Sequence, residues 1–419
     1  MGATPVLEVA VIGAGMIVHD QLLPSLYHLQ RLGQIGQISI AGTRASSLRA
    51  LRDAPALARG FPGQSFTALP GFDATEPDPQ AYKALLRALP PRQLVIIALP
   101  DQLHFEVTMA ALEHDQHVCC VKPLTLTHRE GQAIAQVAAA RGLLVAVEYH
   151  KRFDRRALIA RRRCRDGQFG QFVAGEARLI EPWYYRESNF QQWFTVDQAD
   201  PFVYVGCHYT DQVTFLTGLL PVEVSVAGLR NRFPNGKEGF MWSSGRVRFE
   251  NGGLLHVLNG LGYPDDGAGS NDQGISLFFE GEGRGGCLRH NDQFRGIEHG
   301  FATGTGKGFN YINPDYFQYV PWDGPGLAPV GYGYDSVAAI VGVACRVTSA
   351  TAGLDDFAAL AERRKLLTEL DAAGLIATAA NSAYNELVME AARLSILNDG
   401  DRVAIRYGDH PGVELVQRA

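Results

Sequence analysis

A lysine in this chain follows directly on a buried strand, where its ammonium group could reach a ligand. Leu94–Leu99 is an unbroken apolar run, which is typical of a strand buried on both faces of a parallel sheet. A helix is expected over His104–Glu113, and Val118–Val121 forms a second short strand before Lys122 and Pro123. Ligands of open parallel sheets bind at the carboxyl ends of the strands. Lys122 is therefore a candidate functional cation, the alternative being an ordinary solvent-facing loop lysine.

A histidine and an aspartate form a second candidate group. His208 and Asp211 lie three residues apart in a predicted helix that continues to Gly218, so the two side chains share one helix face. An imidazole with a pKa near neutrality is the usual proton carrier when an alcohol is oxidised to a ketone. A single histidine in a helix can equally be a packing residue, and this alternative stays open.

A glycine-rich turn near the start of the chain has the context of a dinucleotide site. Glu8–Ile12 reads as a strand, and the turn Gly13-Ala14-Gly15-Met16-Ile17-Val18 leads into a helix that reaches about Leu32. The two glycines allow a tight turn and let a pyrophosphate approach the backbone at a helix N-terminus. Val18 stands where the fingerprint usually has Gly or Ala. The prediction therefore depends on the strand before and the helix after, and a plain β–α turn is the alternative.

The end of the second predicted strand, Ile38–Ala41, indicates the preferred cofactor. Sites that prefer NAD usually place Asp or Glu there to accept from the ribose 2′-hydroxyl. This chain instead has Thr43 and Arg44, whose hydroxyl and guanidinium suit a 2′-phosphate. We therefore expect NADP, with NAD as the alternative. Arg44 could also simply begin the next helix and face water.

Composition excludes several classes of protein. The 419 residues are 46% hydrophobic and 20% charged, which is ordinary for a globular protein of two or three domains. A net charge of −6 argues against a general nucleic-acid binder. No apolar run is long enough for a membrane helix, and the N-terminus has no basic region typical of a signal peptide. Six cysteines show no metal-ligand spacing. We expect a cytoplasmic protein with reduced thiols and no bound metal.

The pattern changes from about Gln171. We expect an N-terminal dinucleotide-binding domain over 1–148 and an α+β domain over 149–419. Several strand-like runs follow one another with few helices, which favours a mostly antiparallel sheet. These runs are Phe172–Leu179, Val222–Leu229, Gly245–Glu250, Leu254–Asn259, Ile275–Glu280 and Gly286–Arg289. The stretch from Pro55 to Pro79 reads as an irregular connection, and Val403–Arg406 as a last edge strand.

Two aromatic stretches, about 181–204 and 291–334, lie between the strands of the second domain. Aromatic rings in loops over a cleft would suit stacking on the face of a sugar. They would equally suit a packed surface cover, and the sequence does not separate these two readings.

Together these segments resemble the glucose–fructose oxidoreductase / inositol dehydrogenase / rhizopine catabolism family (Gfo/Idh/MocA) over nearly the whole chain. The matching motifs, in chain order, are VIGAGMI, Leu99-Pro100 followed by His104, HVCCVKPLTLT, EYHKRFD, GCHYTD and NSAYNELVMEAARLSI. Each motif alone is weak, but their order and spacing are specific. The resemblance implies an α/β fold, with an N-terminal Rossmann domain and a C-terminal α+β domain built on a large open sheet.

The resemblance also implies roles for individual residues. Lys122 would contact the nicotinamide ribose and the reacting oxygen, His208 would act as general acid/base, and Asp211 would orient His208 or the substrate. The implied cofactor-binding residues follow the same motifs: Gly13, Gly15, Met16, Ile17, Thr43, Arg44, Leu99, Pro100, Gln102, His104, Lys122 and Arg152.

Two positions depart from the family pattern. Val121 replaces the glutamate before the lysine, and Tyr204 replaces the aspartate four residues before His208. Tyr204 could donate a hydrogen bond or relay a proton, but a phenol of ordinary pKa is a poor base at pH 7.

These observations lead us to expect hydride transfer between a nicotinamide cofactor and a ring carbon of a sugar, glycoside or cyclitol. The alternatives are a redox-neutral glycosidase that retains NAD and a non-catalytic cofactor-binding protein. We expect a homodimer or homotetramer formed through the C-terminal sheet, with no nucleic-acid or membrane partner.

Overall fold

The structure is a computed structural model of the chain and describes residues 6–266, 271–281, 284–291 and 316–417. The chain divides into two compact units. Unit 1 contains Met1–Thr125, Arg129–Phe153 and Phe317–Asn381; unit 2 contains Leu126–His128, Asp154–Tyr316 and Ser382–Ala419. A first, short crossing covers Leu126–His128. The expected boundary at residue 148 lies a few residues before the main crossing, between Phe153 and Asp154. It places Phe317–Asn381 in the second domain, however, whereas these residues pack with unit 1.

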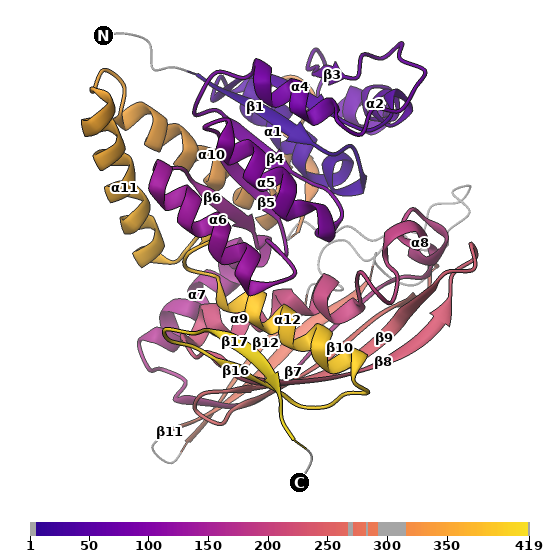
Figure 1. Cartoon of the computed structure of the whole chain (residues 1–419), viewed down its shortest axis with the longest axis vertical. Helices are drawn as coiled ribbons and strands as arrows, with labels where there is room; N and C mark the ends of the chain where they lie inside the picture. The colour runs from indigo at the N-terminus through magenta and orange to yellow at the C-terminus, as the bar shows by residue number, and fades with distance from the viewer. Residues whose placement is uncertain (1–5, 267–270, 282–283, 292–315, 418–419) are drawn as a thin grey trace. The chain divides into compact units, whose positions relative to one another are not determined.

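Unit 1 is built on a seven-stranded sheet in the order β15-β6-β5-β4-β1-β2-β3 (Figure 1). Its strands are β1 Leu7–Ile12, β2 Ile35–Ala41, β3 Thr67–Leu69, β4 Leu94–Ile97, β5 His117–Val121, β6 Val145–Glu148 and β15 Ala377–Thr378. All neighbours are parallel except β15, which runs antiparallel to β6. The order reverses beside β1, as in a doubly wound dinucleotide-binding fold. This arrangement confirms the predicted Rossmann fold.

Helices cover both faces of this sheet. They are η1 Val18–Leu22, α1 Leu23–Arg31, α2 Ala45–Arg52, α3 Pro55–Gly60, α4 Ala81–Ala88, η2 Asp101–Leu103, α5 His104–Glu113, α6 His128–Arg141, η3 His150–Phe153, α10 Tyr332–Ala350 and α11 Asp356–Ala373. Alternate strand residues such as Val9 and Ile96 share one buried core with Leu26 of α1 and Ile340 of α10. Burial on both faces explains the unbroken apolar runs in the strands. Helix α3 lies within the stretch that the sequence pattern read as irregular.

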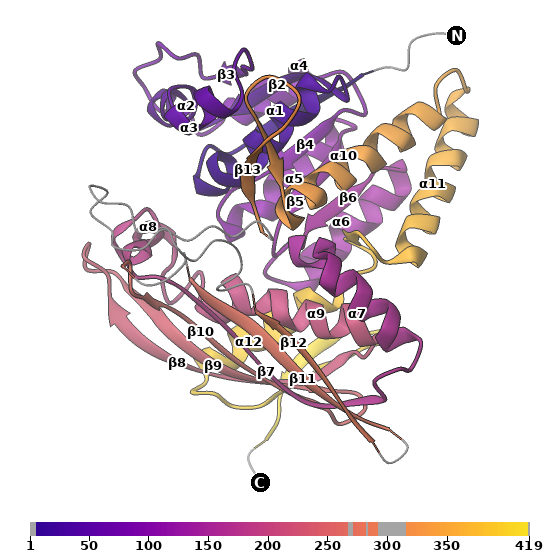
Figure 2. The ribbon, with the colours of Figure 1, turned by 180° about the vertical axis from the view of Figure 1, so that it is seen from behind.

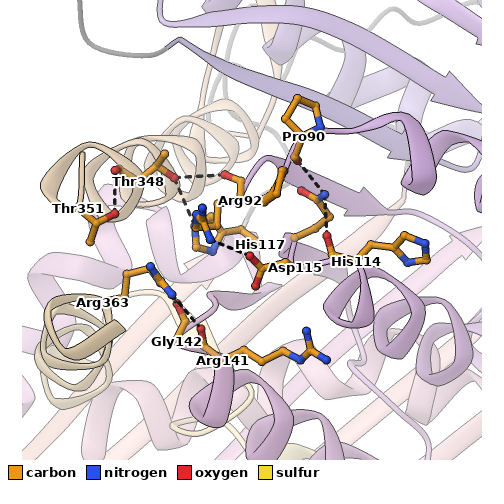
Figure 3. Close-up of polar contacts among 12 residues, drawn as sticks. Pro90, Arg92, His114, Asp115, His117, Arg141, Gly142, Thr348, Thr351 and Arg363 are labelled. Atoms are coloured by element: carbon orange, nitrogen blue, oxygen red, sulfur yellow. Dashed lines mark hydrogen bonds and ion pairs between the residues drawn. The ribbon is translucent and has the colours of Figure 1, made fainter. Parts of the chain in front are cut away.

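A polar network anchors α10 and α11 to the Rossmann sheet (Figure 3). The Nδ1 atom of His117, at the start of β5, accepts a hydrogen bond from the Leu144 amide at 3.0 Å, and its Nε2 atom lies 3.4 Å from the Thr348 hydroxyl of α10. Arg363 of α11 donates to the Gly142 carbonyl at 3.0 Å. Burial, together with the nearby cations of Arg363 and Arg92, lowers the pKa of His117 to about 3. The two late helices are thus integral to unit 1.

A hairpin late in the chain is attached to α1. It consists of β13 Gln318–Pro321 and β14 Leu327–Val330. The guanidinium of Arg31 lies between the rings of Trp322 and Phe61, 4.4 and 5.0 Å from their centroids, and donates to the Pro325 carbonyl at 2.8 Å. Part of the second aromatic stretch therefore packs as a cover on the Rossmann unit. Its residues 292–315 lie outside the described part of the chain.

Unit 2 is built on an eight-stranded sheet in the order β12-β11-β7-β10-β9-β8-β16-β17 (Figure 2). Its strands are β7 Gln171–Pro182, β8 Pro221–Arg232, β9 Glu238–Phe249, β10 Leu254–Tyr263, β11 Asp272–Gly281, β12 Arg284–Asn291, β16 Val403–Arg406 and β17 Gly412–Leu415. Only β7 and β10 pair in parallel; every other neighbour is antiparallel, as expected. Strand β16 is not the edge strand predicted, because β17 pairs on its far side.

One face of this sheet carries helices and the other is open. The helices of unit 2 are α7 Arg155–Arg165, η4 Trp183–Glu187, α8 Phe190–Trp193, η5 Phe202–Gly206, α9 Cys207–Thr217 and α12 Tyr384–Leu397. Helices α9 and α12 lie together on one face (Figures 1 and 2). Within the described residues no helix covers the other face, on which Leu229 is 68% exposed and Leu258 and Phe278 are each over 40% exposed.

Candidate functional site

The glycine turn after β1 has the geometry of a phosphate-binding loop. Gly13 has a φ of +122°, and a Cβ placed on it would lie 2.1 Å from the Ala98 carbonyl oxygen, so only glycine fits there. A Cβ on Gly15 would meet nothing within 4 Å. The Val18 and His19 amides donate to the Gly15 carbonyl as the helix begins. Val18 is fully buried in the core, and this packing accounts for the departure from the fingerprint at that position.

Met16 and Ile17 occupy the first helical positions after Gly15, and Met16 is exposed. Their position at a helix N-terminus beside an open glycine is the arrangement that holds a pyrophosphate. The predicted residues of this turn are thus brought together as expected for a cofactor site.

Thr43 and Arg44 follow β2 at the same edge of the sheet, and both are exposed. The Asp78 amide donates to the Thr43 carbonyl at 2.7 Å, and the Gly42 amide donates to the Leu69 carbonyl at 2.9 Å, so the turn is held from both sides. The structure gives the Arg44 guanidinium no ion pair or side-chain hydrogen bond within the described ranges. Its guanidinium remains available for an anionic ligand.

The turns after β4 and β5 carry the next group of predicted residues. Leu99, Pro100 and Lys122 are half-buried. The Oε1 atom of Gln102 is buried and has no hydrogen-bond partner in the described part of the chain. An unpaired acceptor at this edge would suit a donor of a bound ligand, because burying it unpaired costs free energy.

His104 is fully buried, and its expected place among the cofactor-binding residues stays a prediction. Its Nδ1 lies 2.7 Å from the Pro123 carbonyl oxygen and its Nε2 2.9 Å from the Leu99 carbonyl oxygen. The ring connects the turn after β4 to the turn after β5.

Arg152, the last predicted cofactor residue, is also buried. Its guanidinium lies 5.8 Å from the ring centroid of Tyr149. Beside it, Glu148 at the end of β6 accepts hydrogen bonds from Ser336 at 2.6 Å and Gln21 at 3.1 Å, and it pairs with His150 at 2.9 Å. Sequence reasoning did not find this network, since Gln21, Glu148 and Ser336 are far apart in the chain.

Several features at one edge of the unit 1 sheet suit a nicotinamide dinucleotide. The open space at Gly15, the helix N-terminus beside it, the unpaired Gln102 oxygen and the exposed cation of Arg44 all lie after neighbouring parallel strands. This is the edge at which doubly wound sheets bind ligands. The residues present fit the cofactor.

The candidate acid–base residues lie in unit 2. His208 is in the first turn of α9 and 3% exposed; Asp211, one turn later, is 1% exposed. Asp211 accepts a hydrogen bond from the Tyr384 hydroxyl at 2.8 Å and from the Asn385 amide at 2.9 Å, both from the start of α12. Tyr384 and Asn385 belong to a motif that the sequence pointed to, without any indication that they would meet Asp211.

Tyr204 lies in the π-helix η5, which runs directly into α9. Its ring packs against those of Phe190, Phe194 and Trp193, with centroid separations of 5.1, 5.7 and 6.0 Å. Much of the first aromatic stretch is therefore a packed cluster. π-helical turns often occur at functional sites.

Among the described residues, no three His, Cys, Asp or Glu side chains are arranged to hold a metal ion. None of the described helices is both long enough and apolar enough to cross a membrane.

Comparison with known proteins finds a family match for the Rossmann part of the chain. Residues 7–149 match the family model GFO_IDH_MocA, described as an oxidoreductase family with an NAD-binding Rossmann fold. The D-glucoside 3-dehydrogenase of Escherichia coli is 27% identical over 222 residues, which are 52% of this chain and 56% of that protein. The NADP-dependent scyllo-inositol 2-dehydrogenase IolW of Bacillus subtilis is 35% identical over 132 residues, 31% of this chain and 36% of that protein.

These alignments thus span only about a third to just over half of the curated relatives. Among solved structures, scyllo-inositol dehydrogenase from Lactobacillus casei, with bound NAD(H) and scyllo-inositol, has the same fold. Its TM-score is 0.60 at 14% identity, over 96% of this chain and 99% of that one. The Rossmann part of the chain, residues 7–149, thus matches the Gfo/Idh/MocA oxidoreductase family model, and solved dehydrogenases share the fold of nearly the whole chain.

Proposed function

We propose that this protein is an NAD(P)-dependent dehydrogenase or reductase that acts on a ring hydroxyl or ketone of a sugar, glycoside or cyclitol. The observation that carries the proposal is the ligand edge of unit 1, where Gly13 and Gly15 shape an open turn before a helix N-terminus. The two relatives named above, a glucoside dehydrogenase and an inositol dehydrogenase, support a carbohydrate substrate. They also favour net dehydrogenation over a redox-neutral glycosidase.

Each candidate residue has a distinct role in this proposal. When bound, the nicotinamide would accept or supply the hydride. Lys122 would place its ammonium near the reacting oxygen and stabilise the negative charge that develops there. His208 would take the proton from the hydroxyl through a ring nitrogen, and would return it in the reverse reaction. Asp211, held by Tyr384 and Asn385, would orient His208 or a substrate hydroxyl.

We infer that NADP is the preferred cofactor. Thr43 and Arg44 are both exposed after β2, and a guanidinium forms strong charge-assisted hydrogen bonds with a phosphate. The NADP-dependent relative IolW is compatible with this preference.

Fluorescence titration with NADPH and NADH tests the proposal directly. The wild type should bind NADPH more tightly than NADH. Arg44→Ala should weaken NADPH binding roughly tenfold, which corresponds to about 1.4 kcal/mol, because the guanidinium contact to the 2′-phosphate is lost. NADH binding should be almost unchanged. Arg59→Ala is the matched control, because Arg59 is an exposed arginine of the same unit. Equal affinities for the two nucleotides, unaffected by Arg44→Ala, would exclude the NADP preference. Binding of neither would exclude the dehydrogenase.

A substrate screen then tests the reaction. Glycosides, free sugars and inositols are incubated with oxidised cofactor, and formation of reduced nicotinamide is followed by absorbance. Turnover that ceases in His208→Asn would support the assigned proton carrier. Release of an aglycone without net cofactor reduction would contradict the proposed activity.

We also propose that the open face of the unit 2 sheet joins copies of the chain. The exposed apolar residues Leu229, Leu258 and Phe278 share this face with exposed polar residues. Exposed apolar side chains on a sheet face that no described helix covers favour an association surface.

A further inference from the structure

His104 joins two turns at the proposed cofactor edge. It is the first residue of α5, and its ring reaches the Leu99 carbonyl after β4 and the Pro123 carbonyl after β5. Strands β4 and β5 are neighbours in the sheet. The ring therefore bridges the turn that carries Pro100 and the turn that carries Lys122.

The two partners of the ring determine its charge. A backbone carbonyl oxygen can only accept a hydrogen bond, and a neutral imidazole has only one N–H to donate. Contacts of 2.7 and 2.9 Å to two carbonyls are both satisfied only when both ring nitrogens carry a proton. A ring that donates to both carbonyls is an imidazolium, here in a fully buried position.

The surroundings compensate this buried charge. Burial by itself would lower the pKa of His104, but the charge and hydrogen bond of Cys120 on β5 outweigh it, with further contributions from Asp101 in η2 and the Pro123 carbonyl. Together they raise the pKa to about 9. A buried cation is tolerated only with such partners.

We propose that His104 is a positioning residue for Lys122: its imidazolium fixes the turn after β5 against the turn after β4, and so holds the lysine in register with the cofactor edge. This inference rests on the proposed cofactor function. It assigns His104 no contact with cofactor or substrate.

The test separates the two hydrogen bonds. In His104→Asn the side-chain amide can replace Nδ1 and donate to the Pro123 carbonyl, whereas in His104→Gln it can replace Nε2 and donate to the Leu99 carbonyl. Each variant keeps one bond and loses the other, and His104→Phe loses both. His114→Asn is the matched control, because the His114 ring, at the end of the same helix, is within 2.8 Å of one carbonyl, that of Ala110.

Titration with NADPH and NADH is the first readout. For the nucleotide that the wild type binds more tightly, we expect His104→Asn and His104→Gln to raise the Kd about tenfold. His104→Phe should raise the Kd further, and the control His114→Asn should leave it unchanged. The inference would be overturned if His104→Asn and His104→Gln bind the nucleotide as tightly as the wild type while circular dichroism shows that both are folded. A wild type that binds neither nucleotide would overturn the proposed function and this inference with it.

Two further readouts distinguish positioning by an imidazolium from simple packing. Nitrogen-15 NMR of the wild type, assigned with His104→Gln, should show both ring nitrogens protonated at pH 7.5; a neutral ring would overturn the inference. The wild-type Kd should rise as the pH passes through about 9, because the second N–H is lost. This rise in Kd near pH 9 should be absent in His104→Asn and His104→Gln and should persist in Lys122→Met. A rise that is absent in Lys122→Met but present in the two His104 variants would contradict the assignment to His104.

Discussion

The carboxylate of Asp211 accepts a hydrogen bond of 2.8 Å from the hydroxyl of Tyr384, a residue 173 positions further along the chain. The same carboxylate oxygen accepts from Asn385 at 2.9 Å. Both donors come from α12, which lies with α9 on one face of the unit 2 sheet. The orientation of the proposed acid–base helix therefore depends on the last helix of the chain.

Removing this hydrogen bond should affect catalysis more than stability. Tyr384→Phe leaves Asp211 with the Asn385 amide, so we expect about 0.5–1.5 kcal/mol lower stability, the usual net value of one such bond. We expect kcat to fall roughly tenfold, because Asp211 loses part of its fixed orientation. Urea unfolding and steady-state kinetics measure the two effects.

The control for this variant is Tyr407→Phe. It removes a tyrosine hydrogen bond of 2.7 Å to the Pro221 carbonyl, at the start of β8 in the same unit, which does not involve Asp211. Equal losses of kcat in both variants would show that the Tyr384 effect is a general loss of stability.

The two glycines of the β1 turn should respond differently to the same substitution. Gly13→Ala forces a Cβ to 2.1 Å from the Ala98 carbonyl oxygen at a φ of +122°, so we expect both folding and cofactor binding to fail. Gly15→Ala meets nothing within 4 Å and should fold normally. Its methyl group would occupy the space proposed for the pyrophosphate, so we expect cofactor affinity to drop at least tenfold. Unchanged affinity in folded Gly15→Ala would place the phosphates elsewhere.

His117 should make the protein sensitive to acid. Its pKa is lowered to about 3 in the folded state, first by burial and then by Arg363 and Arg92, whereas the unfolded chain takes up the proton near pH 6.5. The stability contributed by the neutral ring is therefore complete above pH 6.5 and is lost as the pH falls toward 3. The loss from this site approaches about 1.4 kcal/mol per pH unit.

His117→Phe tests this assignment by urea unfolding at pH 7 and pH 5. The variant leaves the Leu144 amide without its acceptor, so it should be about 1–3 kcal/mol less stable at pH 7. It should lose less stability than the wild type between the two pH values. His410→Asn, at an exposed site, is the control. An identical pH dependence in His117→Phe and the wild type would contradict the assignment.

Charge on the open face of the unit 2 sheet should disrupt the proposed oligomer. Leu258→Glu combined with Phe278→Glu places two carboxylates among exposed apolar residues of this face. We expect light scattering to show monomers for the double variant and a larger assembly for the wild type. Leu354→Glu, at an exposed site in unit 1, is the control. An unchanged assembly would exclude this face as the interface.

The sequence by itself determined the Rossmann strands and the positions of the candidate cofactor residues. The buried runs Leu94–Leu99 and Val118–Val121 have no polar face, and this composition is possible only where helices cover both sides of a sheet. Gly13 and Lys122 are adjacent in sequence to the ends of such strands. Because parallel strands end at a common edge, local pattern alone was enough to bring these residues together.

The tertiary structure decided what depends on contacts between distant residues. Local pattern did not show that His104 connects two carbonyls, that Asp211 meets Tyr384, or that Phe317–Asn381 completes the core of unit 1. In each case a polar or apolar group is buried by a partner from another part of the chain. A buried group must be matched in hydrogen bonding and shape by whatever the fold places beside it, and a linear sequence does not state those neighbours.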